Sequence, residues 1–309
     1  MSDAMTHSPP TSSLPHGAGR AYLLLTITTM CWGGNAIFGR LAVGQISPML
    51  LVSMRWFGAV LLLSIFAGKY FRRDWPMIRS HFRYLFAMGA IGFTVFNSLF
   101  YIAAHSTTAV NIGIIQGSMP AFVLIGAYIF YRTPVSGLQK AGVGLTFLGV
   151  IIVGIGGDVS RISDIALNHG DLIMLGASVL YAGYTVGLRK RPPISSLGLF
   201  FALALAAFLA SIPLATAEII AGQVIWPGTE GWIIVALITL FPSFIAQITF
   251  IQGVEQIGPG RASIFINLVP VFAAIFAVSY LREPFEIFHA IALSLVLGGI
   301  WLSEKGKIS

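Results

Sequence analysis

The sequence predicts an all-α membrane protein with ten transmembrane helices, arranged as two inverted five-helix repeats with both termini in the cytoplasm. Three observations predict this fold. Hydrophobic residues make up 56% of the 309 positions and charged residues only 9%, which leaves too little polar surface for a soluble globule. Ten apolar runs have the length of about 20 residues that crosses a bilayer. A segment of the first half also recurs in the second half.

The recurring segment spans residues 120–134 and returns as residues 270–284, with six of fifteen positions identical. Each copy begins at a proline and ends at an arginine two residues before another proline, a pattern that stops a helix. The first apolar run belongs to the same repeat, because its Trp32 returns 149 residues later as Tyr181. We therefore expect this run to remain in the mature chain and not to be a cleaved signal peptide.

The lengths of the apolar runs define the expected elements and domains. The ten helices are expected near residues 21–43, 48–68, 84–104, 108–131, 139–156, 171–188, 197–221, 231–252, 261–281 and 285–303. The expected domains are a disordered cytoplasmic tail (1–20), a first repeat (21–156), a linker (157–170), a second repeat (171–303) and a cytoplasmic tail (304–309).

Lysine and arginine residues gather on one side of the predicted helices. With the N-terminus in the cytoplasm, fourteen of the eighteen lie in cytoplasmic segments, three lie on the opposite side, and Arg55 lies within the second run. This bias follows the positive-inside rule, so the net charge of +7 reflects membrane topology and not a nucleic-acid partner. Because five helices is an odd number, the second half starts on the opposite face and runs inverted.

Five short motifs accompany this pattern. They are Cys31-Trp32-Gly33-Gly34-Asn35, Met119-Pro120, Gly170-Asp171-Leu172, Val269-Pro270 and Leu281-Arg282-Glu283-Pro284. With these motifs the chain resembles, over nearly all of residues 21–303, the drug/metabolite transporter superfamily of proteins with two EamA-type repeats. Within that superfamily it is similar to the YddG-type exporters of aromatic and other neutral amino acids.

The resemblance implies a multi-pass protein of the bacterial inner membrane that exports small organic solutes, with amino acids as the expected substrate, by alternating access. Alternating access also follows from inverted repeats, which exchange conformations to open one face while closing the other. The first half departs from the family pattern, because Thr133 stands where the family more often carries a glutamate. A role for that acid is therefore expected only at Glu283.

Polar side chains deep in a membrane span are costly, so they tend to face a cavity or a partner helix. On this basis, together with aromatic side chains at helical spacing, we expect a substrate cavity. Its expected lining residues are Trp32, Asn35, Phe96, Asn97, Phe100, Tyr101, Gln116, Tyr181, Tyr184, Ser243, Gln247 and Asn267. The alternative interpretation is that these groups hydrogen-bond between packed helices.

Two prolines are expected to bend helices beside this cavity. Pro120 and Pro270 occupy matching positions in the fourth and ninth helices, where a proline frees backbone groups. Because the repeats are inverted, the two helices should bend on opposite sides of the bilayer centre and line the transport path.

Charged groups within the runs are few. Arg55 lies about 10 Å into the second run, a depth that favours a side chain reaching the outer interface or capping carbonyl groups over one that meets a substrate carboxylate. His105 is interpreted as a wetted boundary residue in preference to a proton relay. Since no acidic residue lies in the middle third of a run, transport is expected to be uncoupled from ions.

The sequence contains no Walker loop, zinc motif or Gly-x-Ser-x-Gly elbow, and Cys31 is its single cysteine. We therefore expect no catalytic residues, no metal and no cofactor. The expected partners are a small-molecule substrate and the lipid bilayer, with the chain as a monomer or a weak dimer. The alternatives are a transporter of another metabolite or drug, an intramembrane enzyme, and a channel or scaffold. An enzyme would need acids, histidines or a nucleophile clustered on one face of the bundle, and the sequence does not offer that cluster.

Overall fold

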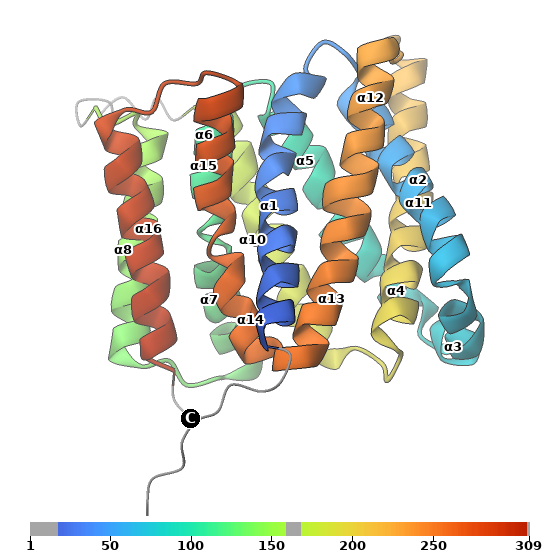
Figure 1. Cartoon of the computed structure of the whole chain (residues 1–309), viewed down its shortest axis with the longest axis horizontal. Helices are drawn as coiled ribbons and strands as arrows, with labels where there is room; N and C mark the ends of the chain where they lie inside the picture. Colours follow the sequence, from blue (N-terminus) through green and yellow to red (C-terminus); the bar gives the residue numbers. More distant parts are fainter. Residues whose placement is uncertain (1–17, 159–167, 308–309) are drawn as a thin grey trace, which may run out of the picture.

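The computed structural model describes residues 18–158 and 168–307. Within these residues every regular element is helical, and ten helical segments are long and apolar enough to cross a membrane. They stand side by side as one bundle (Figure 1). The predicted fold class of an all-α, ten-span membrane protein is confirmed.

The bounds of the helices follow the predicted runs closely. In chain order they are α1 (Ala18–Ala42), α2 (Pro48–Phe66), α3 (Gly68–Ser80), α4 (Phe82–Gly89), η1 (Ala90–Val95), α5 (Phe96–Ala103), α6 (Ala109–Gln116), α7 (Met119–Tyr131), α8 (Gly137–Gly154), α10 (His169–Gly187), η2 (Leu188–Lys190), α11 (Ser196–Ile220), α12 (Thr229–Ile238), η3 (Thr239–Ile245), α13 (Ala246–Ile257), α14 (Pro259–Ile266), α15 (Val269–Tyr280) and α16 (Ile287–Lys305). Helix α1 begins before the predicted start at 21, and α16 continues into the predicted tail 304–309. Most of the predicted tail 1–20 and linker 157–170 lies outside the described residues.

Helix α3 was expected to be a connector. Its thirteen residues include four arginines or lysines, too many for an apolar run, but Ile78 is buried while Trp75 is exposed, as in a helix lying along a bundle end. The Asp74 carboxylate accepts hydrogen bonds from the backbone N–H (3.0 Å) and hydroxyl of Ser195, just before α11. These bonds lower the pKa of Asp74, so the carboxylate stays charged. We call this end of the bundle, marked by α3 and the start of α1, the basic face (Figure 1).

The packing of the helices repeats when the two halves are exchanged. Helix α1 packs against α13 and α15, and its counterpart α10 packs against the corresponding α5 and α7. Two further pairs, α2 with α11 and α8 with α16, each join a helix to its own counterpart. Since each half contributes five spans, the halves enter the membrane from opposite faces, and the predicted inverted repeat is confirmed.

Four spans are interrupted, at matching places in the two halves. Two contain π-helical turns, η1 and η3, which begin 149 residues apart. The other two are split into separate helices, α6 and α7 in the first half and α14 and α15 in the second. Pro120 and Pro270 lie in the first turns of α7 and α15. A proline at this position costs its own helix nothing, because the first N–H groups of a helix have no partner within it. A proline cannot, however, donate the N–H bond that would continue the preceding helix, α6 or α14. The short helices α6 and α14 lie toward opposite ends of the bundle (Figure 1).

Each repeated segment stops at an arginine with a left-handed backbone. Arg132 and Arg282 have φ values of 53° and 57°, a conformation that costs an L-residue about 1 kcal/mol or more. The following N–H groups, of Thr133 and Glu283, donate back to the carbonyls of Ala127 (3.3 Å) and Ala277 (3.2 Å). This closing turn fixes where the side chains of the next residues lie.

Helices α8 and α16 approach each other closely because glycines line their contact. A Cβ atom at Gly142 would lie 2.4 Å from the carbonyl oxygen of Gly299, closer than real Cβ contacts come. Gly149 faces the carbonyl of Ala292 at 2.7 Å in the same way. By contrast, Gly144 has open space around its missing Cβ. Gly142 and Gly149 therefore set the distance between the two helices.

This packing predicts opposite effects for two alanine substitutions on the same helix. Gly142→Ala should destabilise the purified protein by about 1–3 kcal/mol, because the methyl group must push the backbones apart. Gly144→Ala is the matched control and should be neutral or stabilising by up to about 1 kcal/mol through helix propensity. Thermal unfolding in detergent measures both, and an equal response of the two variants would contradict the assigned packing.

Candidate functional site

A cavity of about 630 Å³ runs from the interior of the bundle to the basic face. Exposed Arg189 and Lys307 belong to its lining, so the cavity opens at this end. Eleven side chains singled out from the sequence also line it: Trp32, Asn35, Phe96, Asn97, Gln116, Pro120, Tyr181, Tyr184, Gln247, Asn267 and Pro270. The two prolines bring the broken spans to the cavity wall.

Three residues expected in the lining lie behind it. Phe100, Tyr101 and Ser243 are at most 2% exposed and are not part of the cavity surface. Tyr101 lies one turn beyond Asn97 on α5, about 6 Å further from the basic face, and the cavity ends before that level. Phe100 packs beside Gly39 of α1, where a Cβ would lie 3.2 Å from its ring. Helical spacing identified the correct face of α5 but not the depth at which the cavity stops.

Arg55 lies at the closed end of the cavity and is 3% exposed. Its Nε donates to the hydroxyl of Ser243 at 2.9 Å, and its Nη1 donates to Asn97 Oδ1 at 2.6 Å and to the Tyr101 hydroxyl at 2.5 Å. The Tyr101 hydroxyl in turn donates to Asn35 Oδ1 at 3.0 Å. One guanidinium thereby joins α2, α5 and η3, which come from both halves of the chain.

The preferred interpretation of Arg55 from the sequence was wrong. The side chain neither reaches an interface nor caps carbonyl groups, because α2 turns it toward the centre of the bundle. Depth along a helix tells how far a side chain could reach, whereas the direction it takes depends on which face packs inward. The charge in an apolar run did indicate a residue that borders the cavity.

Aromatic rings form much of the cavity wall. Trp56 stacks on Phe93 with ring centroids 4.6 Å apart, and Phe96 lies 4.9 Å from Tyr181. Across the cavity lining, Trp32 meets Phe250 at 5.3 Å. Sequence analysis missed Trp56 and Phe250, although Phe250 follows Gln247 at helical spacing and Trp56 neighbours the buried arginine.

The end of the bundle opposite the basic face is closed by charged and polar contacts. The Glu283 carboxylate accepts the first two N–H groups of α6, from Ala109 (3.0 Å) and Val110 (3.1 Å). Arg40 lies 3.7 Å from the same carboxylate and donates to the Ala104 carbonyl at 2.5 Å. These bonds tie α1 and α6 of the first half to the segment before α16 in the second. His105 is exposed in the adjoining connection between α5 and α6.

The counterpart contacts at the basic face are incomplete. Arg189, which corresponds to Arg40, donates to the hydroxyl of Thr133 at 3.1 Å. Thr133 corresponds to Glu283, yet within the described residues it makes no hydrogen bond to the start of α14, the counterpart of α6. Both Thr133 and Arg189 line the cavity mouth. The protein is therefore in a conformation that is open at the basic face and closed at the other.

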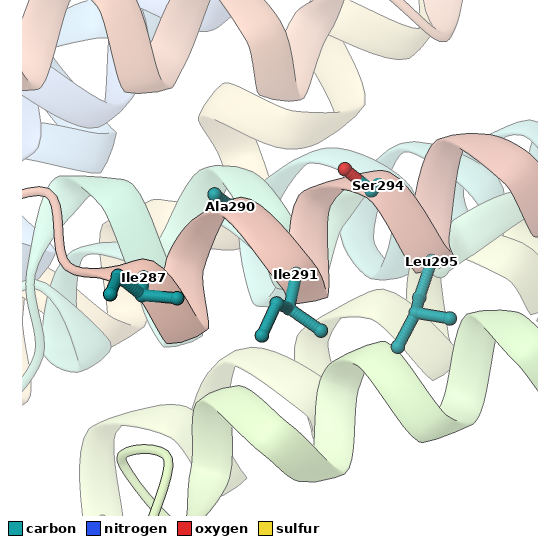
Figure 2. Close-up of a pocket in the computed structure, with 5 residues that line it drawn as sticks. All are labelled: Ile287, Ala290, Ile291, Ser294 and Leu295. Carbon is teal, nitrogen blue, oxygen red and sulfur yellow. The ribbon is translucent and has the colours of Figure 1, made fainter.

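A second hollow lies on the outside of α16. It has a volume of about 390 Å³ and is lined by Ile287, Ala290, Ile291, Ser294 and Leu295. Figure 2 shows Ile287, Ile291 and Leu295 projecting from one side of the helix. Since Ile287 is 81% exposed, this hollow belongs to the apolar exterior of the bundle and is separate from the central cavity.

An inverted ten-span bundle around a polar and aromatic cavity that opens on one face defines a membrane transporter. Comparison with protein families agrees with this class. The chain belongs to the EamA-like transporter family, whose model matches residues 19–155 and again residues 168–304. The two matches are offset by 149 residues, the same shift that relates the two halves of the sequence.

Relatives in bacteria and archaea are named transporters. Three of them align with this chain over most of their length. YyaM of Bacillus subtilis strain 168, named an uncharacterized transporter, is 27% identical over 93% of this chain and 94% of its own. An uncharacterized transporter of Archaeoglobus fulgidus is 26% identical over 92% and 97%. YedA of Escherichia coli K12, named an uncharacterized inner membrane transporter, is 23% identical over 89% and 88%.

A solved crystal structure has the same fold. It covers 92% of this chain and 96% of its own, with a TM-score of 0.62 and 17% sequence identity. At this identity the match shows the fold alone.

The one-sided opening predicts the reactivity of introduced cysteines, in a background with Cys31→Ala. A cysteine replacing Ser303, which lines the cavity, should react with an impermeant thiol reagent from the basic face. A cysteine replacing buried Val110 at the closed end should be unreactive from either face. Labelling in vesicles of both orientations measures this, with Gln223→Cys in the exposed connection before α12 as the sidedness control. Equal reactivity of the Ser303 and Val110 variants would contradict the assigned opening.

Proposed function

We propose that this protein exports small organic solutes, with aromatic and other neutral amino acids as substrates, by alternating access and without ion coupling. The observation that carries the proposal is the central cavity, which is deep, partly apolar and open on one face only. Its volume of about 630 Å³ lies within the range of small-molecule sites. The resemblance to YddG-type exporters favours amino acids within that size class.

The chemistry of the lining suits a solute with one apolar and one polar part. Trp32, Phe96 and Tyr181 supply aromatic surface, which binds hydrocarbon and ring side chains well. Gln116 and Gln247 supply amides that donate and accept hydrogen bonds. A small number of polar groups in a largely apolar wall orients a ligand without holding it too tightly for release.

The distribution of acidic groups supports uncoupled transport. Glu304 is the one acidic residue in the described lining, and it lies at the mouth beside Lys307. Asp171 is buried but belongs to the closed end, where it accepts hydrogen bonds from Thr107 and Asn111. Among the described residues, no carboxyl group therefore lines the deep part of the cavity, where a bound solute could compete with a proton.

Transport into liposomes tests the substrate and the coupling together. Purified protein should move labelled leucine and phenylalanine down their gradients, with saturation and with acceleration by unlabelled substrate on the far side. Lysine should be moved poorly, because no acid in the deep cavity balances its side chain. Accumulation that requires an imposed pH difference would contradict uncoupled transport. Flux that never saturates would indicate a channel, and no flux of any amino acid would favour another metabolite or drug.

Alternating access predicts a second state in which Thr133 closes the basic face against α14, as Glu283 closes the other face against α6. Thr133→Glu should strengthen that closure, because a carboxylate at a helix N-terminus contributes about 0.5–2 kcal/mol. Labelling of a cysteine at Ser303 from the basic face should slow by about threefold or more. Thr133→Gln is the neutral control of equal size. Equal labelling rates in the two variants would refute this closure.

A further inference from the structure

The guanidinium of Arg55 is buried without a carboxylate partner. Its three hydrogen bonds go to neutral groups, on Ser243, Asn97 and Tyr101, and involve only Nε and Nη1. Within the described residues, Nη2 donates to no protein group. Because arginine has five N–H groups in a planar fork, part of its donor capacity remains free at the cavity wall.

A buried cation without a counter-charge is costly in a membrane bundle. The acidic groups nearest to the bundle interior are engaged elsewhere. Glu218 accepts from the start of α2, Glu283 from the start of α6, and Asp171 from Thr107 and Asn111, all at the closed end. None of them lines the cavity, so none of these three carboxylates balances the charge of Arg55.

A second donor without a partner lies next to it. The indole Nε1 of Trp56 is buried and makes no hydrogen bond within the part of the chain that the structure describes. Trp56 is 2% exposed and also lines the cavity. An unmatched buried donor is unfavourable unless something fills it. Two neighbouring residues of α2 thus offer unfilled donors, one of them charged.

We propose that the closed end of the cavity is an anion site, in which Arg55 binds the carboxylate of the transported solute. This inference rests on the proposed function and narrows its substrate class to organic carboxylates. The carboxylate supplies both the missing negative charge and acceptor oxygens for free N–H groups, in the planar geometry that a guanidinium recognises. An amino group is accommodated by amides and rings and is not required.

The surrounding bonds hold the guanidinium ready for this role. Asn97 is itself fixed by its Nδ2, which donates to the Phe93 carbonyl in η1 at 2.5 Å. Ser243 donates to the Ile238 carbonyl at 2.8 Å. Since Asn97 and Ser243 are themselves fixed by backbone carbonyls of η1 and α12, the free edge of Arg55 is presented to the cavity without reorganisation.

Three probes of similar size separate the groups of one amino acid. Leucine carries both groups, isocaproate keeps the carboxylate but lacks the amine, and isoamylamine keeps the amine but lacks the carboxylate. Thermal stabilisation of the purified, full-length protein reports the binding of each probe. We expect leucine and isocaproate to raise Tm in a saturable manner and isoamylamine to leave Tm unchanged.

Variants at the site distinguish binding from a purely structural role. Arg55→Gln should weaken the binding of leucine and isocaproate by at least about tenfold, since it removes a charge-assisted hydrogen bond. Arg55→Lys keeps the charge but not the fork and should lose less. Asn97→Asp is nearly isosteric, accepts the same bond from Arg55, and places a competing carboxylate there, so it should also weaken both ligands by about tenfold. Arg72→Gln on exposed α3 is the control and should bind as the wild type does.

The outcomes separate this proposal from the proposed function. Binding of isocaproate but not leucine would support the anion site and overturn amino acid transport. Leucine binding that survives both Arg55→Gln and Asn97→Asp would overturn the anion site and leave amino acid transport standing. Binding of isoamylamine alone, or of none of the three probes, would overturn both. If Arg55→Gln does not fold, Asn97→Asp decides the question.

Discussion

The hydrogen bonds of Arg55 are the constraint around which the interior of this protein is arranged. A charged guanidinium inside a membrane bundle needs polar partners, because a buried donor without one costs far more free energy than the loss of an exposed contact. Asn97 and Tyr101 approach from α5 and Ser243 from η3, so groups from both halves converge on one residue of α2. These contacts form the closed end of the cavity, and the space between them and the basic face is open to a solute.

The interruptions of the helices make that arrangement possible in a bilayer. Irregular backbone is tolerated at membrane depth only where it is buried in protein or borders a cavity, and Gly92, Phe93, Gly117, Pro242 and Asn267 all border this one. A π turn or a break rotates the helix beyond it, which lets the same span present one face to the cavity and another to its neighbours. Because the interruptions recur in both halves, each half carries its own point of adjustment.

The bundle was predictable because hydropathy, charge bias and the 149-residue repeat are properties of the chain itself. Most of the cavity lining could be predicted as well, since Asn97, Gln247 and their neighbours are polar or aromatic where lipid would reject them. The rest depended on three-dimensional facts that no local pattern carries. Tyr101 lies one turn further along α5 than the lining residue Asn97, Ser243 is buried beside the lining residue Pro242, and the direction of Arg55 depends on how α2 is rotated. Helix α3 was missed because its charges conceal a helix that does not span.

The two ends of this transporter are not equivalent, because the acid Glu283 stands at one end where the alcohol Thr133 stands at the other. In an alternating-access carrier, unequal closures give the empty protein a preferred orientation. In an uncoupled carrier, detailed balance still requires the ratio of maximal rate to KM to be the same in both directions. The individual KM values and maximal rates are free to differ between the two faces. A sequence difference of one residue between repeats can thus adapt a passive carrier to a dilute pool on one side and a concentrated pool on the other.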